Sequence, residues 1–224
     1  MLKLRRFNII CGHYGSGKTN LALNMALKGA LEGKKITVVD LDTVNPYFRT
    51  AEYKSLLSEY DIELIAPQFA ATNLDIPSLP PEINSIFLKN DRYVIVDVGG
   101  DDAGATVLGC FSARIKSIDD YSLLYVINKY RPLTQTGAEA DEILKEIESA
   151  SRLKATAIVN NSHLQSITTS EDILSCLEYA ENVSSLTALP IEATVVPDFL
   201  EQELKDKINN LYPVKIIVKP PWAN

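Results

Sequence analysis

The segment from Gly12 to Thr19 constrains the fold of this 224-residue chain more than any other part of its sequence. It reads Gly-His-Tyr-Gly-Ser-Gly-Lys-Thr and matches the pattern G-x-x-x-x-G-K-[ST] in full. The apolar run at residues 7–11 predicts a buried strand before it, and the apolar spacing over residues 20–31 predicts a helix after it. A glycine-rich turn between a strand and a helix directs backbone N–H groups toward an anion.

The residue types in this loop favour a nucleotide as that anion. Glycines allow the backbone to wrap around phosphates, Lys18 is placed to neutralise the β- and γ-phosphates, and the Thr19 hydroxyl is placed to ligate Mg²⁺. The alternative is a chance glycine-rich turn, and the flanking strand and helix argue against it. We therefore expect a nucleotide to bind the whole loop, which comprises Gly12, His13, Tyr14, Gly15, Ser16, Gly17, Lys18 and Thr19.

The rest of the chain alternates short apolar runs with longer helical patterns. The apolar runs lack the polar alternation of a strand with one face in water, so both faces of their sheet must be covered. The sequence therefore predicts an α/β fold of three layers, with a mostly parallel central sheet and helices on both faces. The predicted strands lie at residues 7–11, 36–39, 62–65, 93–98, 123–127, 155–159, 193–196 and 214–218.

The helical patterns and the lack of a long linker predict one domain. Thr168 and Glu171 form a capping-box pattern that opens a helix reaching about Tyr179. We expect a single domain over residues 1–218, followed by a loose tail at residues 219–224. The other predicted helices lie at residues 20–31, 46–60, 82–88, 103–116 and 139–150, with one more near residue 198, and residues 66–81 are expected to form a loop.

Acidic residues close two of the predicted strands. Asp40 and Asp42 end the second strand, and Asp97 ends the strand at residues 93–98. In a parallel sheet these ends meet at the crevice that holds the phosphate loop. We expect Asp97 and Asp40 to join Thr19 in holding Mg²⁺, and Asp42 to orient the attacking water; capping of loops is the alternative for all three. Gly100, in a D-x-x-G pattern, can sense the γ-phosphate through its N–H. The alternative for this segment is a helix N-terminus enriched in aspartate, and the two interpretations are compatible.

Composition narrows the class of protein and of partner. A hydrophobic content of 46% and a charged content of 23% are those of a globular chain, which excludes a disordered or fibrous protein. The net charge of −7 argues against nucleic acid and anionic membranes as partners. We also expect a cytoplasmic protein, because the chain shows no membrane span, its start is too short for a signal peptide and its three cysteines are scattered.

Together, the phosphate loop, the D-x-D strand end at Asp40 and Asp42, and the D-x-G-G segment from Asp97 to Gly100 resemble one branch of the P-loop ATPases. That branch contains MinD, ParA, the nitrogenase iron protein and the CobQ/CobB-type amidotransferase ATPase domains. The resemblance covers most of the chain and implies ATP or ADP as the nucleotide and Mg²⁺ as the metal. It also implies that Asp42, in switch I, positions the water, and that Asp97 and Gly100 belong to switch II.

The resemblance also implies a site for the base. Asn161 corresponds to the asparagine that reads adenine, with Asn160 as the alternative, and Pro197 and Asp198 correspond to the loop that flanks the base. An asparagine after a strand is equally a turn residue. No N-K-x-D guanine signature is present, because the segment at residues 128–131 lacks the aspartate, and this favours ATP over GTP.

Two departures from the family pattern limit what the resemblance implies. His13 stands where the family has its signature lysine, which in dimeric members reaches the partner's nucleotide. A histidine offers a shorter and pH-dependent donor, or is an ordinary loop residue, so a nucleotide-bridged homodimer and fast hydrolysis stay open. The chain has neither a C-x-x-C nor paired cysteines among Cys11, Cys110 and Cys176, so we expect no iron–sulfur cluster.

Three functions fit these observations. The first is a Mg²⁺-dependent switch ATPase that couples a change in switch I and switch II to an unknown protein partner. The second is an ATP-dependent small-molecule kinase or ligase of the dethiobiotin synthetase-like type, with an acceptor near residues 66–81 or near Lys129 and Arg131. The third is a nucleotide sensor without turnover. For Lys129 and Arg131 we expect a solvated loop rather than an acceptor site.

Overall fold

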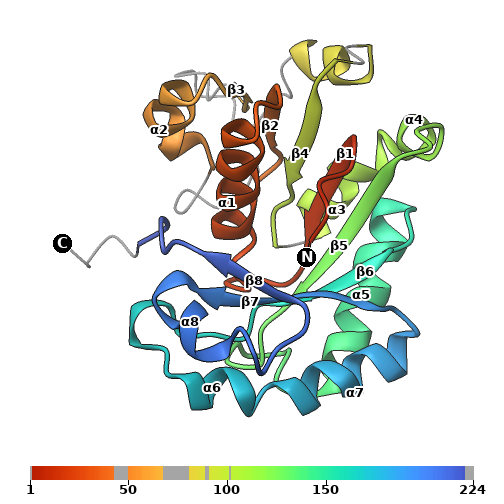
Figure 1. Cartoon of the computed structure of the whole chain (residues 1–224). Helices are drawn as coiled ribbons and strands as arrows, with labels where there is room; N and C mark the ends of the chain where they lie inside the picture. The colour runs from red at the N-terminus through yellow and green to blue at the C-terminus, as the bar shows by residue number, and fades with distance from the viewer. Residues whose placement is uncertain (1, 43–49, 68–80, 89–90, 101, 220–224) are drawn as a thin grey trace, which may run out of the picture.

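The computed structural model describes residues 2–42, 50–67, 81–88, 91–100 and 102–219, and a parallel sheet runs through this part of the chain (Figure 1). The strands follow the order β3-β2-β4-β1-β5-β6-β7-β8, and every neighbouring pair is parallel. The predicted α/β fold is therefore confirmed, with a sheet that is entirely parallel among these strands. Their bounds are β1 Phe7–Cys11, β2 Ile36–Asp40, β3 Glu63–Ile65, β4 Tyr93–Asp97, β5 Tyr121–Ile127, β6 Ala157–Asn160, β7 Ile191–Pro197 and β8 Leu211–Val214.

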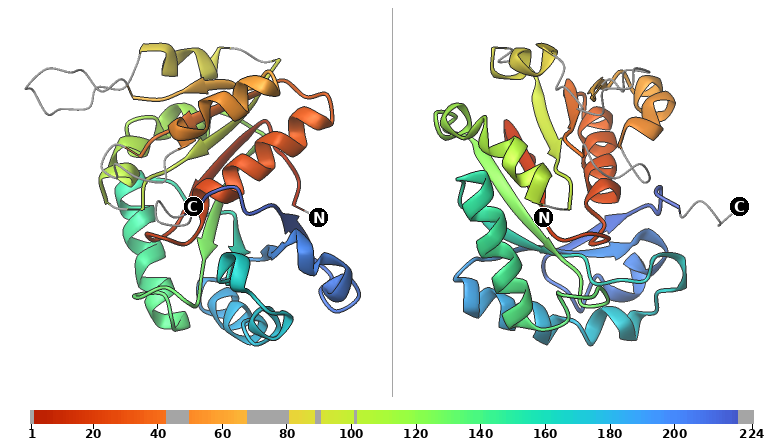
Figure 2. Two further views of the ribbon diagram at one scale, coloured as in Figure 1. Left: turned by 90° about the vertical axis from the view of Figure 1, so that its left-hand side faces the viewer. Right: turned by 180° about the vertical axis from the view of Figure 1, so that it is seen from behind.

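Helices cover both faces of the sheet, as the apolar runs predict. Their bounds are α1 Lys18–Leu31, α2 Lys54–Glu59, α3 Asp102–Gly109, α4 Ser112–Lys116, α5 Gly137–Ser151, α6 Ser170–Leu174, α7 Leu177–Thr187 and α8 Glu201–Leu204, with 3-10 helices at Thr50–Tyr53, Pro81–Phe87, Gln165–Ile167 and Asp198–Leu200. Helix α1 lies in front of the sheet in Figure 1, whereas α5 comes to the front in the view from behind in Figure 2. None of the helices in the described segments has the length and apolar character needed to cross a bilayer.

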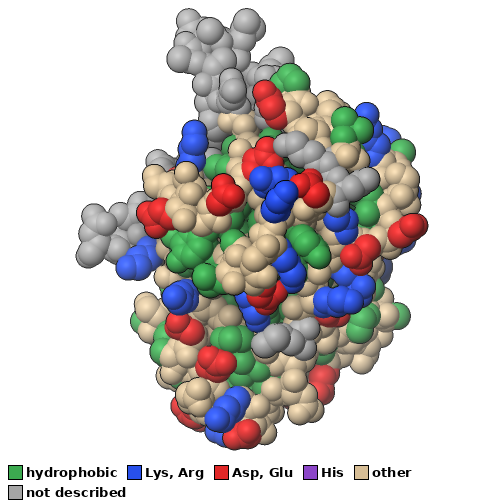
Figure 3. All heavy atoms as spheres, turned by 45° about the horizontal axis from the view of Figure 1, so that its top comes forward, with side chains coloured by type: hydrophobic (Ala, Val, Ile, Leu, Met, Phe, Trp, Pro, Cys, Tyr) green, Lys and Arg blue, Asp and Glu red, His purple; other side chains and the backbone are tan. Residues whose placement is uncertain are grey.

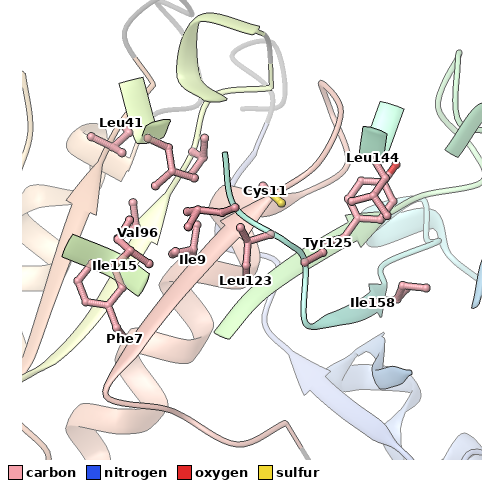
Figure 4. Close-up of a cluster of buried hydrophobic side chains, with 14 of the residues drawn as sticks. Phe7, Ile9, Cys11, Leu41, Val96, Ile115, Leu123, Tyr125, Leu144 and Ile158 are labelled. Carbon is pink, nitrogen blue, oxygen red and sulfur yellow. The ribbon is translucent and has the colours of Figure 1, made fainter. Parts of the chain in front are cut away.

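Alternate side chains of each strand pack on opposite faces of the sheet. Phe7, Ile9 and Cys11 of β1 join the apolar cluster under α3, α5 and α7 (Figure 4), and Ile10 between them joins the cluster under α1. All four side chains are at most 1% exposed. Burial on both faces explains why the strands read as continuous apolar runs rather than as alternating ones.

The strand register brings the acidic strand ends to one level of the sheet. Ile10 of β1 pairs with Asp97 of β4, and Asp97 pairs in turn with Asp40 of β2. Strand β1 lies between β4 and β5, so the loop that follows Cys11 emerges between the ends of those two strands. The fold thus places the phosphate loop and both acidic strand ends at the same edge.

Several predicted helices are interrupted or shifted. The helix expected at residues 103–116 is broken after Gly109, where a Cβ would lie 2.6 Å from the carbonyl oxygen of Ala150, so α3 ends where its backbone meets α5. The helix expected at residues 82–88 is a 3-10 helix at Pro81–Phe87. Of the helix expected at residues 46–60, positions 46–49 lie outside the described residues and the remainder is a 3-10 turn followed by α2.

The predicted capping box is wrong by one residue. Thr169 and Asp172 form it: the Thr169 hydroxyl accepts from the N–H of Asp172 at 3.2 Å, and Asp172 Oδ2 accepts from the N–H of Thr169 at 2.8 Å. Thr168 serves the preceding turn instead, because its hydroxyl accepts from the N–H of Leu164 at 2.8 Å. The helix that follows is also divided, into α6 and α7.

The last strand lies three residues earlier than predicted, at Leu211–Val214 instead of residues 214–218. The backbone groups that follow β8 form hydrogen bonds with side chains of α1. Asn20 Nδ2 donates to the carbonyl of Lys215 at 3.1 Å, and Asn20 Oδ1 accepts from the N–H groups of Ile217 and Val218 at 2.9 and 3.1 Å. These hydrogen bonds hold residues 215–218 against α1, so this segment does not extend β8. The expected loose tail lies, from residue 220 on, outside the described residues.

Acidic and basic side chains are interspersed on the molecular face that Figure 3 presents. Opposite charges meet in surface ion pairs such as Lys35 with Asp91 at 2.9 Å and Lys145 with Asp141 at 2.6 Å. Exposed pairs of this kind contribute about 0–1 kcal/mol each to stability. The apolar clusters on the two faces of the sheet therefore carry most of the stabilisation.

Replacing Asn20 with alanine should destabilise the fold by about 2–4 kcal/mol, because two backbone N–H groups near Val218 would lose their acceptor. Asn24→Ala is the matched control: Asn24 bonds the same segment through Lys215 at exposed positions, so we expect a loss below about 1 kcal/mol. Urea unfolding followed by circular dichroism measures both. Equal losses of the free energy of unfolding in the two variants would contradict the role of Asn20 as a buried hydrogen-bond acceptor for this segment.

Candidate functional site

The phosphate loop from Gly12 to Gly17 has a backbone that requires its glycines. Gly12, Gly15 and Gly17 have φ values of 147°, 69° and 92°, a region that other residues enter only with strain. A Cβ at Gly12 would lie 2.3 Å from the carbonyl oxygen of Val126, and one at Gly17 would lie 2.1 Å from Nδ2 of Asn161. The loop is therefore enclosed by β5 and by the segment after β6, and no side chain fits at either position.

Lys18 arches over this loop. Its Nζ donates to the carbonyl oxygen of His13 at 3.0 Å, and the residue is only 8% exposed. Burial and the nearby Lys18 both lower the pKa of His13. His13 is therefore largely neutral near pH 7, which leaves Lys18 as the basic side chain of the loop.

Asp97 is buried at the end of β4, where two hydroxyl groups hold one of its carboxylate oxygens. Oγ1 of Thr19 donates to Oδ2 at 2.7 Å, and Oγ1 of Thr50 donates to the same oxygen at 2.8 Å. The other oxygen, Oδ1, is buried and has no hydrogen-bond partner among the described residues. Burial raises the pKa of Asp97, while Lys18 and the two hydroxyls lower it. One carboxylate oxygen is thus left for a further group.

The other two candidate acids lie beside Asp97. Asp40 is 1% exposed, and its Oδ1 accepts from the N–H of Asp42 at 3.0 Å. Asp42 is close enough for its charge to contribute to the raised pKa of Asp97. The structure therefore brings together the three aspartates that the sequence singles out; the segment after Asp42, at residues 43–49, lies outside the described residues.

The donors at this edge fit Mg²⁺ as part of a nucleotide complex. The Thr19 hydroxyl and the oxygens of Asp97 and Asp40 are hard oxygen ligands, and Asp97 Oδ1 is a buried acceptor in need of a partner. No group of three His, Cys, Asp or Glu side chains that could hold a metal ion is found in the described segments. A Mg²⁺ ion held here would also need phosphate oxygens and water as ligands, as in phosphoryl-transfer sites.

Gly100 lies directly against the phosphate loop. A Cβ at Gly100 would lie 2.8 Å from the backbone nitrogen of Tyr14 and 2.9 Å from its Cα. This close approach explains why the position carries glycine. Sensing of the γ-phosphate by Gly100 stays a prediction, and the contact provides a route from the phosphate loop to the segment after β4.

Asn161 contacts the phosphate loop from the segment after β6. Its Nδ2 donates to the carbonyl oxygen of Ser16 at 2.6 Å, whereas Asn160 turns inward and its Oδ1 accepts from the N–H of Ser162 at 3.2 Å. Pro197 is buried at the end of β7 and Asp198 is exposed directly after it. All four residues lie at the carboxyl edge of the sheet. Reading of the base by Asn161 stays a prediction, because the observed hydrogen bond is to the loop.

The sequence interpretation missed Thr50 and misjudged Arg131. Thr50 is fully buried on Asp97, and its only sequence signal is a hydroxyl following the D-x-D strand end. Arg131, expected in a solvated loop, has a buried Nε that lies 3.2 Å from where a Cβ of Gly15 would be. Lys129 of the same loop lies elsewhere, with its Nζ 3.4 Å from the carbonyl oxygen of Ser175. The other acceptor region considered, residues 66–81, lies outside the described residues from 68 to 80.

Four buried side-chain atoms at this edge lack a hydrogen-bond partner in the described structure: Ser16 Oγ, Asp97 Oδ1, Arg131 Nε and His163 Nε2. Buried polar atoms in folded proteins are almost always paired, because leaving one unpaired costs about 1–3 kcal/mol. Ser16 belongs to the phosphate loop, and Asp97 and Arg131 lie beside it, so three of these atoms support a polar ligand there. This edge is therefore the candidate functional site.

His163 gives this edge a pH-dependent contribution to stability. Burial and Arg131 lower its pKa to about 4 from an unfolded value of 6.5, so below pH 6.5 the unfolded chain binds a proton that the folded chain rejects. The free energy of unfolding should therefore fall by about 3 kcal/mol as the pH drops from 6.5 through 4, and His163→Gln should lose this component. Urea unfolding of both proteins across that range gives the difference; a difference that does not change with pH would contradict the assignment.

Neither any protein-family model nor any curated protein sequence matches this chain. Solved structures do match. Cell division protein FtsY from Thermotoga maritima aligns with a TM-score of 0.59 and 19% identity, over 85% of this chain and 61% of that one. FtsY from Mycoplasma mycoides aligns with a TM-score of 0.56 and 16% identity, over 85% of this chain and 59% of that one.

The signal recognition particle 54 kDa protein from Aeropyrum pernix K1, solved in complex with GDP, aligns with a TM-score of 0.55 and 18% identity. That match covers 86% of this chain and 41% of the other. This chain thus spans about three-fifths or less of the length of these structures. At such identities the likeness shows the fold alone: the chain has the P-loop NTPase fold.

Proposed function

We propose that this protein is a Mg²⁺-dependent switch ATPase that binds ATP on the loop from Gly12 to Thr19 and hydrolyses its γ-phosphate. The observation that carries the proposal is the arrangement around Asp97. A buried carboxylate oxygen without a partner lies beside the Thr19 hydroxyl at the entrance of a helix, under a loop whose glycines exclude side chains. A nucleotide with its metal satisfies the anion cradle and the open acceptor together.

Each residue then has a definite task in the reaction. Lys18, already held over the loop, neutralises charge that develops on the transferred phosphoryl group. Asp42 orients the attacking water, and Thr19, Asp40 and Asp97 hold the metal. Mg²⁺, when bound, would neutralise negative charge on the phosphates.

The contacts of Asp97 support a switch as well as a site. Thr50 on one side and Thr19 on the other share its Oδ2, and Gly100 on the segment after β4 touches Tyr14 of the loop. A change in the γ-phosphate therefore acts on the segments after β2 and β4 through direct contacts. This is the behaviour we propose for switch I and switch II.

The choice of ATP rests on what surrounds Asn128. Guanine selection through an N-K-x-D segment needs a carboxylate, and Arg131 occupies that position here. Asn128 is moreover engaged inside its loop, since its Oδ1 accepts from the N–H of Tyr130 at 3.0 Å. GTP is the competing nucleotide, because the neighbour from Aeropyrum pernix holds GDP. We include a MinD/ParA-type assignment in this proposal. It depends on the protein preferring ATP to GTP.

A protein partner is proposed at the carboxyl edge. Loops that follow β1, β5, β6 and β7 each expose a large apolar side chain: Tyr14 at 38%, Leu133 at 59%, Ile167 at 74% and Phe199 at 55%. Exposed apolar side chains grouped around one site favour an interaction surface. A second copy of the chain bridging two nucleotides is the alternative occupant.

Lys18→Ala should weaken ATP binding at least tenfold, because the loop loses the lysine that would contact the phosphates. Asp42→Asn should keep ATP binding within about threefold of wild type and lower phosphate release by about 100-fold or more, because the amide cannot take a proton from the attacking water and carries no charge to orient it. Titration calorimetry with ATP and GTP measures binding, and a phosphate-release assay with Mg²⁺ measures turnover.

Asp119→Asn is the matched control, since Asp119 is an exposed carboxylate just before β5, at the opposite end of the sheet. It should behave as wild type. If ATP binds but neither wild type nor any variant releases phosphate, the protein is a nucleotide sensor and not an ATPase. Tighter binding of GTP than of ATP would overturn the nucleotide assignment.

A further inference from the structure

The loop after β5 is built to hold Arg131 in one place. The carbonyl oxygen of Asn128 accepts from the N–H of Arg131 at 3.1 Å and from the hydroxyl of Thr134 at 2.9 Å. Thr134 is itself buried, and its N–H donates to the carbonyl of Arg131 at 3.3 Å. These bonds close a compact turn whose ends are anchored in the core, so the backbone of Arg131 is fixed rather than free in solvent.

The side chain of Arg131 lies along the phosphate loop. Its Cδ, Nε and Cζ are 3.3, 3.2 and 3.4 Å from the position that a Cβ at Gly15 would take. Gly15 is in the middle of the loop and has a positive φ of 69°. The absence of a side chain at Gly15 therefore admits the guanidinium beside the backbone that cradles an anion.

Arg131 is half-buried and has no ion-pair partner in the described segments. Its Nε is buried without a hydrogen-bond partner among these residues. The neighbouring imidazole of His163 is 5% exposed, and its Nδ1 accepts from the N–H of Gln165 at 3.1 Å, which leaves the proton on Nε2. That Nε2 is also buried and unpartnered. Arg131 Nε is thus a buried donor beside the phosphate loop that lacks an acceptor, and a phosphate oxygen can supply one.

We propose that Arg131 is a phosphate-binding residue, which contacts the polyphosphate held by Gly12–Thr19 and supplies a second cation beside Lys18 from within the same chain. The inference rests on the proposed nucleotide site. Arginine suits this task because its planar fork of N–H groups matches phosphate oxygens. His163, held uncharged by burial and by Arg131 itself, adds no competing cation.

The contribution of Arg131 should grow with the number of phosphates on the ligand. Arg131→Gln should weaken ATP binding at least tenfold and AMP binding less than twofold, and Arg131→Lys should recover most of the loss for ATP. Lys129→Gln removes a cation two residues away that faces Ser175, so it should leave both affinities within twofold of wild type. Titration calorimetry with ATP, ADP and AMP measures all four proteins.

An equal loss of affinity for ATP and AMP in Arg131→Gln would overturn the proposal. That result is expected if Arg131 only stabilises the conformation of the phosphate loop. Unchanged ATP binding in Arg131→Gln would overturn it too. If the wild-type protein binds no nucleotide, both this inference and the proposed function are wrong. If binding depends on Lys18 but not on Arg131, only this inference fails.

A measurement on the wild-type chain covers the case in which Arg131→Gln does not fold. The Nε–H resonance of Arg131, assigned by its absence in Arg131→Lys, is followed in ¹⁵N-labelled protein. Saturating Mg-ATP should move this resonance downfield, as a new hydrogen bond to phosphate requires, whereas adenosine should not. A resonance that stays in place at saturating Mg-ATP would overturn the proposal.

Discussion

The buried carboxylate of Asp97 connects the parts of the molecule on which its proposed activity depends. It joins the first turn of α1 through Thr19 and the segment after β2 through Thr50, and it ends the strand that leads to Gly100. Burying a carboxylate raises its pKa and costs stability unless hydrogen bonds compensate. Here only one of its two oxygens is compensated within the described residues. A buried carboxylate with one unpaired oxygen is typical of a site that binds a ligand or a metal ion.

The all-parallel sheet makes this arrangement possible. Because Ile10 and Asp40 both pair with Asp97, the loop after β1 and the acids after β2 and β4 emerge at one level. Close contacts then hold the loop: the Val126 backbone lies under Gly12, the Asn161 side chain under Gly17, and Gly100 against the backbone of Tyr14. Contacts with its surroundings thus fix the backbone of the cradle.

The fold class and the core of the site could be predicted because they depend on local patterns. Continuous apolar runs identify buried parallel strands, and the fixed spacing from Gly12 to Lys18 identifies the loop. The side-by-side placement of Asp40 and Asp97 followed from one rule, that parallel strands end at a common edge. The strand order was not predicted, since it is set by tertiary packing rather than by local sequence.

Other features depended on contacts that the sequence does not display. Thr168 and Thr169 precede Glu171 and Asp172, so either pair fits a capping box, and only the turn that engages Thr168 decides between them. The segment after β8 is as apolar as a strand, but Asn20 of α1 binds its backbone. Arg131 looks like a loop residue until Gly15, more than a hundred positions earlier, is seen beside it.

The most direct test of the account is the dissociation constant of ATP for the unmodified protein, measured with Mg²⁺ and again with excess EDTA. The site needs phosphate oxygens and a metal to satisfy Asp97 Oδ1, so we expect saturable binding that weakens at least tenfold when the metal is removed. Failure of ATP and of GTP to bind at millimolar concentration in either condition would contradict the central claim, that this edge of the sheet is a nucleotide site.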